Sequence, residues 1–216
     1  LVTGGCGSIG SQITKRALER GAATVRVLEN DEAGLFELQQ QIDDTDRLRT
    51  LLGDIRDRDR LRLALENIDI VYHAAALKHV ELNEYNPFEA VRTNVQGTQN
   101  LIRVAMDEEV ESVVVVSTDK ASNPVSVMGA TKLLSERLTI AANTYKGSRN
   151  ARFGCVRFGN VLASAGSVVP TFRKQIRQGG PVTVTNPDMT RFVMPMAEAA
   201  DLVLTAHEQL RNGEVF

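Results

Sequence analysis

The sequence predicts an α/β fold: a doubly wound parallel sheet followed by the beginning of a small C-terminal lobe. Three observations lead to this fold class. Short β-branched runs alternate with segments of helical periodicity, the pattern of parallel sheets covered by helices on both faces. A glycine-rich turn joins the first run to the first helical segment. With 216 residues, the chain is long enough to bury one large core.

The predicted strands are short apolar runs rich in β-branched residues. They are Leu1–Thr3, Val25–Leu28, Arg49–Leu52, Ile68–Tyr72, Ser112–Ser117 and Phe153–Phe158. Amphipathic segments lie between them. The clearest is Phe88 to Met106, whose apolar residues recur at helical spacing after Pro87, a residue suited to a helix start.

The alternation weakens after about Gly159. The remaining residues predict a helix at Pro170 to Arg177, a short strand at Val182 to Thr185 and a helix at Ala197 to Leu210. The chain opens on Leu1, inside a predicted strand, and stops at Phe216, where an apolar run is starting. We therefore expect a chain that is truncated at both ends.

Composition excludes several classes of function. Lys and Arg number 25 against 27 Asp and Glu, a formal net charge of −2, and no long run of one sign would follow a nucleic acid or an anionic membrane. Cys6 and Cys155 lack metal-ligand spacing and are expected to be reduced, and the 3 scattered histidines predict no metal site. The longest apolar stretch, around Val113 to Val116, is far below the ~20 residues of a membrane-spanning helix. We expect a cytoplasmic domain without a membrane segment.

The glycine-rich turn, Thr3 to Gly10 ("TGGCGSIG"), predicts a dinucleotide site. Glycines allow a tight turn and a close approach of the backbone to a pyrophosphate, which then faces the helix N-terminus. The residues expected to contact the cofactor here are Gly4, Gly7, Ser8, Ile9 and Gly10. Glu29 ends the second strand roughly 20 residues later, where a carboxylate binds a ribose diol. Because it would repel a 2′-phosphate, the sequence favours NAD over NADP.

Two later strand ends extend this site. Asp54 and Ile55 could contact adenine, and Ala74 and Ala75 offer small side chains where a cofactor needs room. Each pair could equally serve strand-end packing. We assign residues 1–159 to an NAD-binding Rossmann domain, and residues 160–216 to a partial substrate-binding lobe interleaved with its end.

Several motifs resemble those of the extended short-chain dehydrogenases, within them the nucleotide-sugar 4,6-dehydratases. They are "TGGCGSIG", "LGDIRD", "HAAALKHVELNEYNPFEAVRTNVQGTQN", "STDKASNPVSVMGATK", "RFGNVLASAGSVVPTF" and "GGPVTVTNPDMTRF". Together they cover essentially the whole chain. The resemblance implies a UDP-N-acetylglucosamine-type substrate, a 4-keto-6-deoxy product and a role in polysaccharide or glycan biosynthesis.

Met128 departs from the broad family, which has tyrosine four residues before the lysine that Lys132 matches. Methionine carries no titratable proton, so Met128 cannot deprotonate the sugar 4-hydroxyl and is expected to pack. Some members of the dehydratase branch also resemble Met-x-x-x-Lys, so the chemistry requires another base.

The resemblance places that chemistry on Thr118, Asp119 and Lys120. Asp119 could accept the 4-hydroxyl proton and later protonate the departing 6-hydroxyl, and Thr118 could bond the 4-hydroxyl. Lys120 is the candidate C5 base. It must then be neutral, although an unperturbed lysine has a pKa of ~10.4, and burial beside the nicotinamide and Lys132 would lower that value. The alternative is a polar strand end that caps the next helix.

Further cofactor contacts are expected from Lys132 and Asn94. Lys132 lies one helical turn after Met128 and matches the lysine that binds the nicotinamide ribose; otherwise it is a surface lysine. Asn94 resembles a helix asparagine that supports the active site, although it could bond only backbone. His73 is interpreted as a hydrogen-bonded strand-end histidine and not as a catalyst.

Substrate contacts are assigned to Lys78, Asn160 and Arg191. Lys78 could lie near the sugar or the cofactor, or be merely exposed. Asn160 and Arg191 are expected at the substrate diphosphate, since a guanidinium matches phosphate oxygens bidentately. A surface salt bridge is the alternative for Arg191.

Two other functions stay open. A nucleotide-sugar 4-epimerase shares the fold and NAD but usually needs the tyrosine, and product mass separates it from a dehydratase. A non-catalytic NAD-binding regulatory module would not need Asp119, Lys120 and Lys132. The family habit of pairing the helices near Phe88–Met106 and Val125–Tyr145 implies a homo-oligomer, a dimer or higher. Inversion or retention at C5 is left open.

Overall fold

The computed structural model describes residues 1–43, 46–162, 164 and 167–216, and the three remaining positions of the "RFGNVLASAGSVVPTF" motif lie outside this range. It has a central parallel sheet of 6 strands in the order β3-β2-β1-β4-β5-β6. The strands are β1 (Val2–Thr3), β2 (Val25–Glu29), β3 (Leu48–Leu52), β4 (Ile70–His73), β5 (Ser112–Val116) and β6 (Arg152–Val156). This is the order of a doubly wound dinucleotide-binding fold, so the predicted fold class is confirmed.

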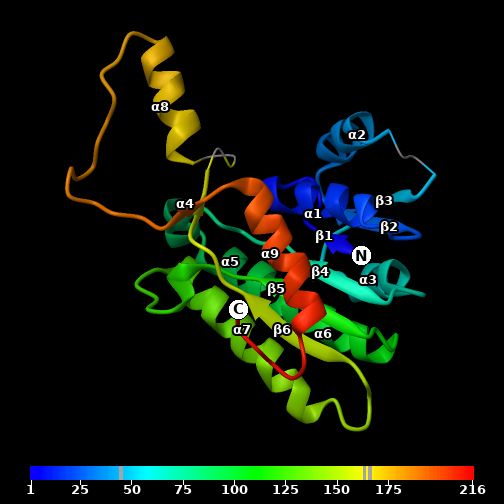
Figure 1. Ribbon diagram of the computed structural model, residues 1–216. Coiled ribbons are helices and arrows are strands. Elements are labelled where there is room, and N and C mark those ends of the chain that lie inside the picture. The colour runs from blue at the N-terminus through cyan, green and yellow to red at the C-terminus, as the bar shows by residue number, and fades with distance from the viewer. Residues whose placement is uncertain (44–45, 163, 165–166) are drawn as a thin grey trace.

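Helices cover both faces of the sheet (Figure 1). The helices of the described residues are α1 (Ser8–Glu19), α2 (Glu32–Gln41), α3 (Arg58–Leu65), α4 (Val80–Tyr85), α5 (Pro87–Ala90), the π-helix η1 (Val91–Gly97), α6 (Thr98–Asp107), the 3₁₀ turn η2 (Asp119–Ala121), α7 (Val127–Tyr145), α8 (Val168–Arg177) and α9 (Met196–Gln209). The predicted helix at Phe88 to Met106 is therefore present, but its middle is widened into a π-helix.

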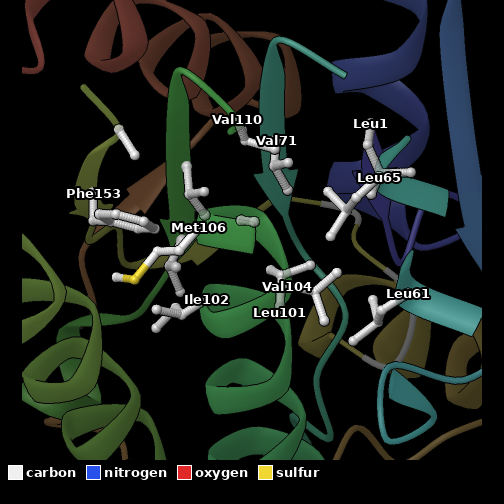
Figure 2. Close-up of a cluster of buried hydrophobic side chains, with 14 of the residues drawn as sticks. Leu1, Leu61, Leu65, Val71, Leu101, Ile102, Val104, Met106, Val110 and Phe153 are labelled. Carbon is white, nitrogen blue, oxygen red and sulfur yellow. The ribbon is translucent and has the colours of Figure 1, made fainter. Parts of the chain in front are cut away.

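Two apolar clusters fill the space between sheet and helices. One joins the sheet to α3, α6 and α7 through side chains such as Leu61, Leu101 and Phe153 (Figure 2). The other joins it to α1, α2 and α9 through Ile13 and Val203. All residues of β5 are buried, because helices cover both faces of the sheet, and its run of valines suits a central parallel strand.

The segment after β6 is mostly exposed. A second, 2-stranded parallel sheet pairs β7 (Asn160–Val161) with β8 (Val193–Met194). Helix α8, between these two strands, stands away from the main sheet, whereas α9, which follows β8, packs on the main sheet (Figure 1). The predicted strand at Val182 to Thr185 is wrong: the Thr183 amide donates to the Gln175 side chain of α8 and not to a neighbouring strand.

Candidate active site

The glycine-rich turn shapes one end of a large cleft. Gly4 has a φ of +69°, and a Cβ there would lie 2.5 Å from the backbone nitrogen of Ala75. A Cβ on Gly10 would collide with the carbonyl oxygen of Gly4, so α1 could not pack this closely on the turn. Gly7, just before α1, has no capping side chain, so none competes with an anion for the first N–H groups of the helix.

The cleft has a volume of about 560 Å³ and runs along the carboxyl ends of the strands. The structure brings the predicted cofactor residues of the strand ends and the turn together in its wall. These are Gly4, Gly7, Ser8, Ile9, Gly10, Glu29, Asp54, Ile55, Ala74 and Ala75. The shape and position of this cleft fit a dinucleotide.

Two carboxylates mark the end of the cleft beside β2 and β3. Glu29 accepts the backbone N–H groups of Asn30 at 2.9 Å and Cys6 at 3.3 Å, which orients it toward the turn. Asp54 is bound by Arg56, with its Oδ2 2.6 Å from Arg56 Nη2. Burial opposes ionisation of Asp54, but the hydrogen bonds and charge of Arg56 outweigh it and lower the pKa of this carboxyl.

His73 ends β4 in a buried hydrogen-bond network. Its Nδ1 lies 2.6 Å from Thr3 Oγ1, and its Nε2 lies 3.0 Å from Thr98 Oγ1. The Thr98 hydroxyl donates to the carbonyl of Asn94, so the proton of His73 belongs on Nε2. Burial, with the nearby charge of Lys132, lowers the pKa of His73 to about 3. The ring is thus neutral and hydrogen-bonded on both nitrogens, as interpreted from the sequence.

Asn94 lies in the π-helix, behind the wall of the cleft. Its side chain brackets Leu77, accepting from the Leu77 N–H at 2.8 Å and donating to the Leu77 carbonyl at 2.9 Å. It also donates to Thr131 of α7 at 3.0 Å. Asn94 therefore fixes the loop after β4 against α7, and a direct cofactor contact stays a prediction.

The turn after β5 brings together the residues to which we assign the proton transfers. Thr118 Oγ1 donates to Asp119 Oδ1 at 2.9 Å, and Lys120 Nζ lies 3.0 Å from the same oxygen. Lys120 Nζ also donates to Asn160 Oδ1 at 3.3 Å. Burial opposes ionisation of Asp119, but hydrogen bonds from Lys120 and Thr118 outweigh it and lower the pKa of the carboxyl.

Helix α7 supplies Met128 and Lys132 to the same cleft. Met128 is only 5% exposed, which suits a packing role. Lys132 Nζ donates to the Val116 carbonyl at 2.7 Å. Lys132 as a whole is partly exposed, and burial of its ammonium group lowers its pKa to about 8 against the opposing effect of Cys155 and Glu136.

The three predicted substrate residues do not share one cleft. Lys78 and Asn160 line the large cleft, and burial lowers the pKa of Lys78. Arg191 lines an adjoining cleft of about 420 Å³, where its Nη1 donates to the Thr190 carbonyl at 2.7 Å. Asp119 lines the adjoining cleft and Lys120 lines both, so the turn to which we assign the proton transfers lies where the two clefts meet.

A protein-family model described as "Polysaccharide biosynthesis protein" matches residues 1–216. The chain belongs to this family. A Methanocaldococcus jannaschii relative named "Uncharacterized membrane protein MJ1061" is 60% identical over 216 residues, covering 100% of this chain and 65% of its own. A Campylobacter jejuni "UDP-N-acetylglucosamine 4,6-dehydratase (inverting)" is 42% identical, and the match covers 100% of this chain and 65% of the relative. A Rickettsia rickettsii "UDP-glucose 4-epimerase" is 39% identical, and the match covers 100% of this chain and 64% of the relative.

This family membership confirms the resemblance inferred from the motifs. The chain spans about 65% of the length of the first of these relatives. In the described part of the chain, no helix is long and apolar enough to cross a membrane. A cytoplasmic location stays a prediction.

Solved structures agree with the fold. The Bacillus thuringiensis protein Pen is 45% identical with a TM-score of 0.96, covering 99% of this chain and 67% of its own. Streptomyces venezuelae DesIV, a dTDP-glucose 4,6-dehydratase crystallised with NAD, is 28% identical with a TM-score of 0.87, covering 100% of this chain and 73% of its own.

The sequence analysis missed the polar residues behind the cleft. Glu136 of α7 is buried and pairs with Arg157, which follows β6. One signal for them was present: Glu136 lies one helical turn beyond Lys132, on the face of α7 that turns inward. The π-helix around Asn94 had no comparable signal.

Proposed function

We propose that this chain is the cofactor-binding and catalytic portion of an NAD-dependent nucleotide-sugar 4,6-dehydratase that acts on a UDP-N-acetylglucosamine-type substrate. One observation carries the proposal. Thr118, Asp119 and Lys120 form a hydrogen-bonded group at the cleft, beside a buried methionine where related enzymes have tyrosine. The Campylobacter relative of that activity supports it.

NAD is the proposed cofactor, and the site fits it. The glycine turn leaves room for a pyrophosphate at the start of α1, and Glu29 faces that turn. Lys132, whose ammonium is anchored on Val116, would hold the nicotinamide ribose. When bound, NAD would supply an acceptor for the hydride that leaves C4 of the sugar and, once reduced, the donor of the hydride that returns to C6.

The residues at the cleft would manage the protons. Thr118 would bond the 4-hydroxyl, and because Thr118 already donates to Asp119, the carboxylate can take up the released proton. Protonated Asp119 would then donate to the departing 6-hydroxyl. Lys120, whose Nζ lies 3.0 Å from Asp119 Oδ1, would take up the C5 proton on its free amine.

The test is incubation of UDP-N-acetylglucosamine with the full-length protein and NAD in deuterated water, followed by mass spectrometry and proton NMR. Loss of one water with deuterium at C5 is the expected result, and the configuration at C5 distinguishes inversion from retention. Product of unchanged mass with a new C4 epimer would overturn the proposal.

A 4-epimerase is the second candidate, because the Rickettsia relative carries that name. Met128 weighs against it, since an epimerase of this fold usually relies on a tyrosine at that position to shuttle the 4-hydroxyl proton. The same incubation decides between the two activities.

A homo-oligomer is also proposed. Apolar side chains on α4 and α5 are strongly exposed, among them Leu82, Tyr85 and Phe88 at 63%, 90% and 84%. Leu134 on α7 is also exposed, and α7 packs beside both short helices. Sedimentation of the full-length protein tests this proposal, and a monomer at micromolar concentration would contradict it.

A further inference from the structure

A buried ion pair lies directly behind the turn that carries Thr118, Asp119 and Lys120. Glu136 of α7 is 1% exposed. Arg157 binds its carboxylate at both oxygens, with Nε 2.8 Å from Oε1 and Nη2 2.6 Å from Oε2. A bidentate pair of this kind fixes the orientation of both partners.

Two serines connect this ion pair to the turn. Ser117 Oγ donates to Glu136 Oε1 at 2.5 Å, and Arg157 Nη1 donates to Ser122 Oγ at 3.0 Å. Ser117 immediately precedes Thr118, and Ser122 immediately follows Ala121. The Glu136–Arg157 pair therefore holds both ends of the segment that includes Thr118, Asp119 and Lys120.

Stability alone is a poor explanation for this pair. Desolvation of a buried ion pair offsets much of its attraction, and apolar side chains of similar size often stabilise a protein as well. What apolar side chains would not provide is the hydrogen bonds that end on Ser117 and Ser122. Glu136 also lies one helical turn from Lys132, and its charge opposes the fall in the Lys132 pKa that burial causes.

We propose that Glu136 and Arg157 are positioning residues, which hold Thr118, Asp119 and Lys120 in the geometry of proton transfer through Ser117 and Ser122. The inference rests on the proposed dehydratase activity. Neither residue needs to touch the sugar. A displacement of about 1 Å at reacting groups is enough to lower turnover on the order of 100-fold, so a small movement of this turn has a large effect.

Kinetics of the full-length enzyme test the proposal. Ser122→Ala, at an exposed position, removes only the connection from Arg157, and we expect kcat to fall about 5-fold to 10-fold with KM and the Kd for NAD unchanged. Glu136→Gln should lower kcat about 50-fold. If the connection runs through Arg157, Ser122→Ala should have no further effect in an Arg157→Lys background. Unchanged kcat in Ser122→Ala and Glu136→Gln, or additive losses in the double variant, would overturn the inference.

Hydrogen exchange gives a readout that needs no substrate. Backbone amides of residues 117–122 should exchange faster in Glu136→Gln, whereas the amides of α1 and α2 should not. Glu208→Gln is the matched control, because it breaks an exposed ion pair with Arg20, 2.9 Å long, far from the cleft. If the wild-type enzyme shows no dehydration, the proposed function fails, and the exchange of residues 117–122 still decides whether the ion pair holds the turn. Unchanged exchange there would overturn the inference in either case.

Discussion

The two sides of the cleft are built in different ways. On the cofactor side, the backbone turn at Gly4 and Gly10 and the buried network of His73 fix the wall within this chain. On the opposite side, every residue from 176 to 193 is exposed, and side-chain bonds from Gln175 hold Thr183. The cofactor side is therefore set by close packing, whereas Arg191 lies at the end of an exposed segment that is joined to the rest of the chain by the β7–β8 pairing, where the Asn160 N–H donates to the Phe192 carbonyl at 2.8 Å.

The largest expected effect lies where the two sides meet. Asp119→Asn removes the carboxylate that accepts a hydrogen bond from Thr118 and forms an ion pair with Lys120. We therefore expect kcat to fall about 1,000-fold while the Kd for NAD stays within a factor of about two. Steady-state kinetics and NAD titration measure the two quantities. Asp59→Asn, at a side chain that is 94% exposed, is the control. Near-normal turnover in Asp119→Asn would remove Asp119 from the mechanism.

The cofactor side can be broken at its tightest contact. In Gly10→Ala, the new Cβ meets the Gly4 carbonyl, so α1 must move away from the turn. We expect the Kd for NAD to rise about 100-fold or more, because the helix N-terminus no longer faces the pyrophosphate. Calorimetric titration measures it. Gly147→Ala, at a positive φ of 68° with open space around it, should cost about 1 kcal/mol of stability and leave NAD binding intact. Normal NAD affinity in Gly10→Ala would contradict the assignment of this turn.

The pH dependence of stability tests the enclosed ammonium of Lys132. Its pKa falls from 10.5 to about 8 on folding, so the unfolded chain binds more protons between these values and stability relative to Lys132→Met should rise with pH across that window. The expected gain is about 3 kcal/mol. Urea unfolding of the NAD-free protein between about pH 7.5 and about pH 10.5 measures this gain in stability. Lys174→Met controls for the loss of a lysine elsewhere, and a difference that stays flat would show that Lys132 is solvated.

The sequence predicted the cofactor side well because its physics is local. Glycines at a strand-to-helix turn and an acidic residue at the next strand end follow from backbone geometry, and these residues do line one cleft. The six predicted strands lie within a few residues of those observed. The position of His73 was likewise predictable, since a histidine at a central strand end finds partners on neighbouring elements.

Other features could not be predicted because they depend on contacts between distant segments. The Glu136–Arg157 pair joins a residue of α7 to the residue that follows β6, and the local sequence around either residue does not predict that the two form a pair. The expected strand at Val182 to Thr185 had suitable β-branched residues but no neighbouring strand to pair with. The placement of Arg191 in the adjoining cleft depends on the path of this same exposed segment.

The smallest expected effect concerns that exposed segment. Gln175→Ala removes two hydrogen bonds of 3.1 Å to Thr183, one to its hydroxyl and one to its backbone N–H. Because both groups can bond water instead, global stability should change by less than about 0.5 kcal/mol and NAD binding should not change. The Thr183 amide, in contrast, should exchange its hydrogen markedly faster. Gln39→Ala, which removes a 2.8 Å bond to Thr50 on the cofactor side, should leave that exchange rate unchanged. If Gln175→Ala instead destabilised the whole protein or weakened NAD, the segment would be coupled to the sheet, and the contrast between the two sides of the cleft would not hold.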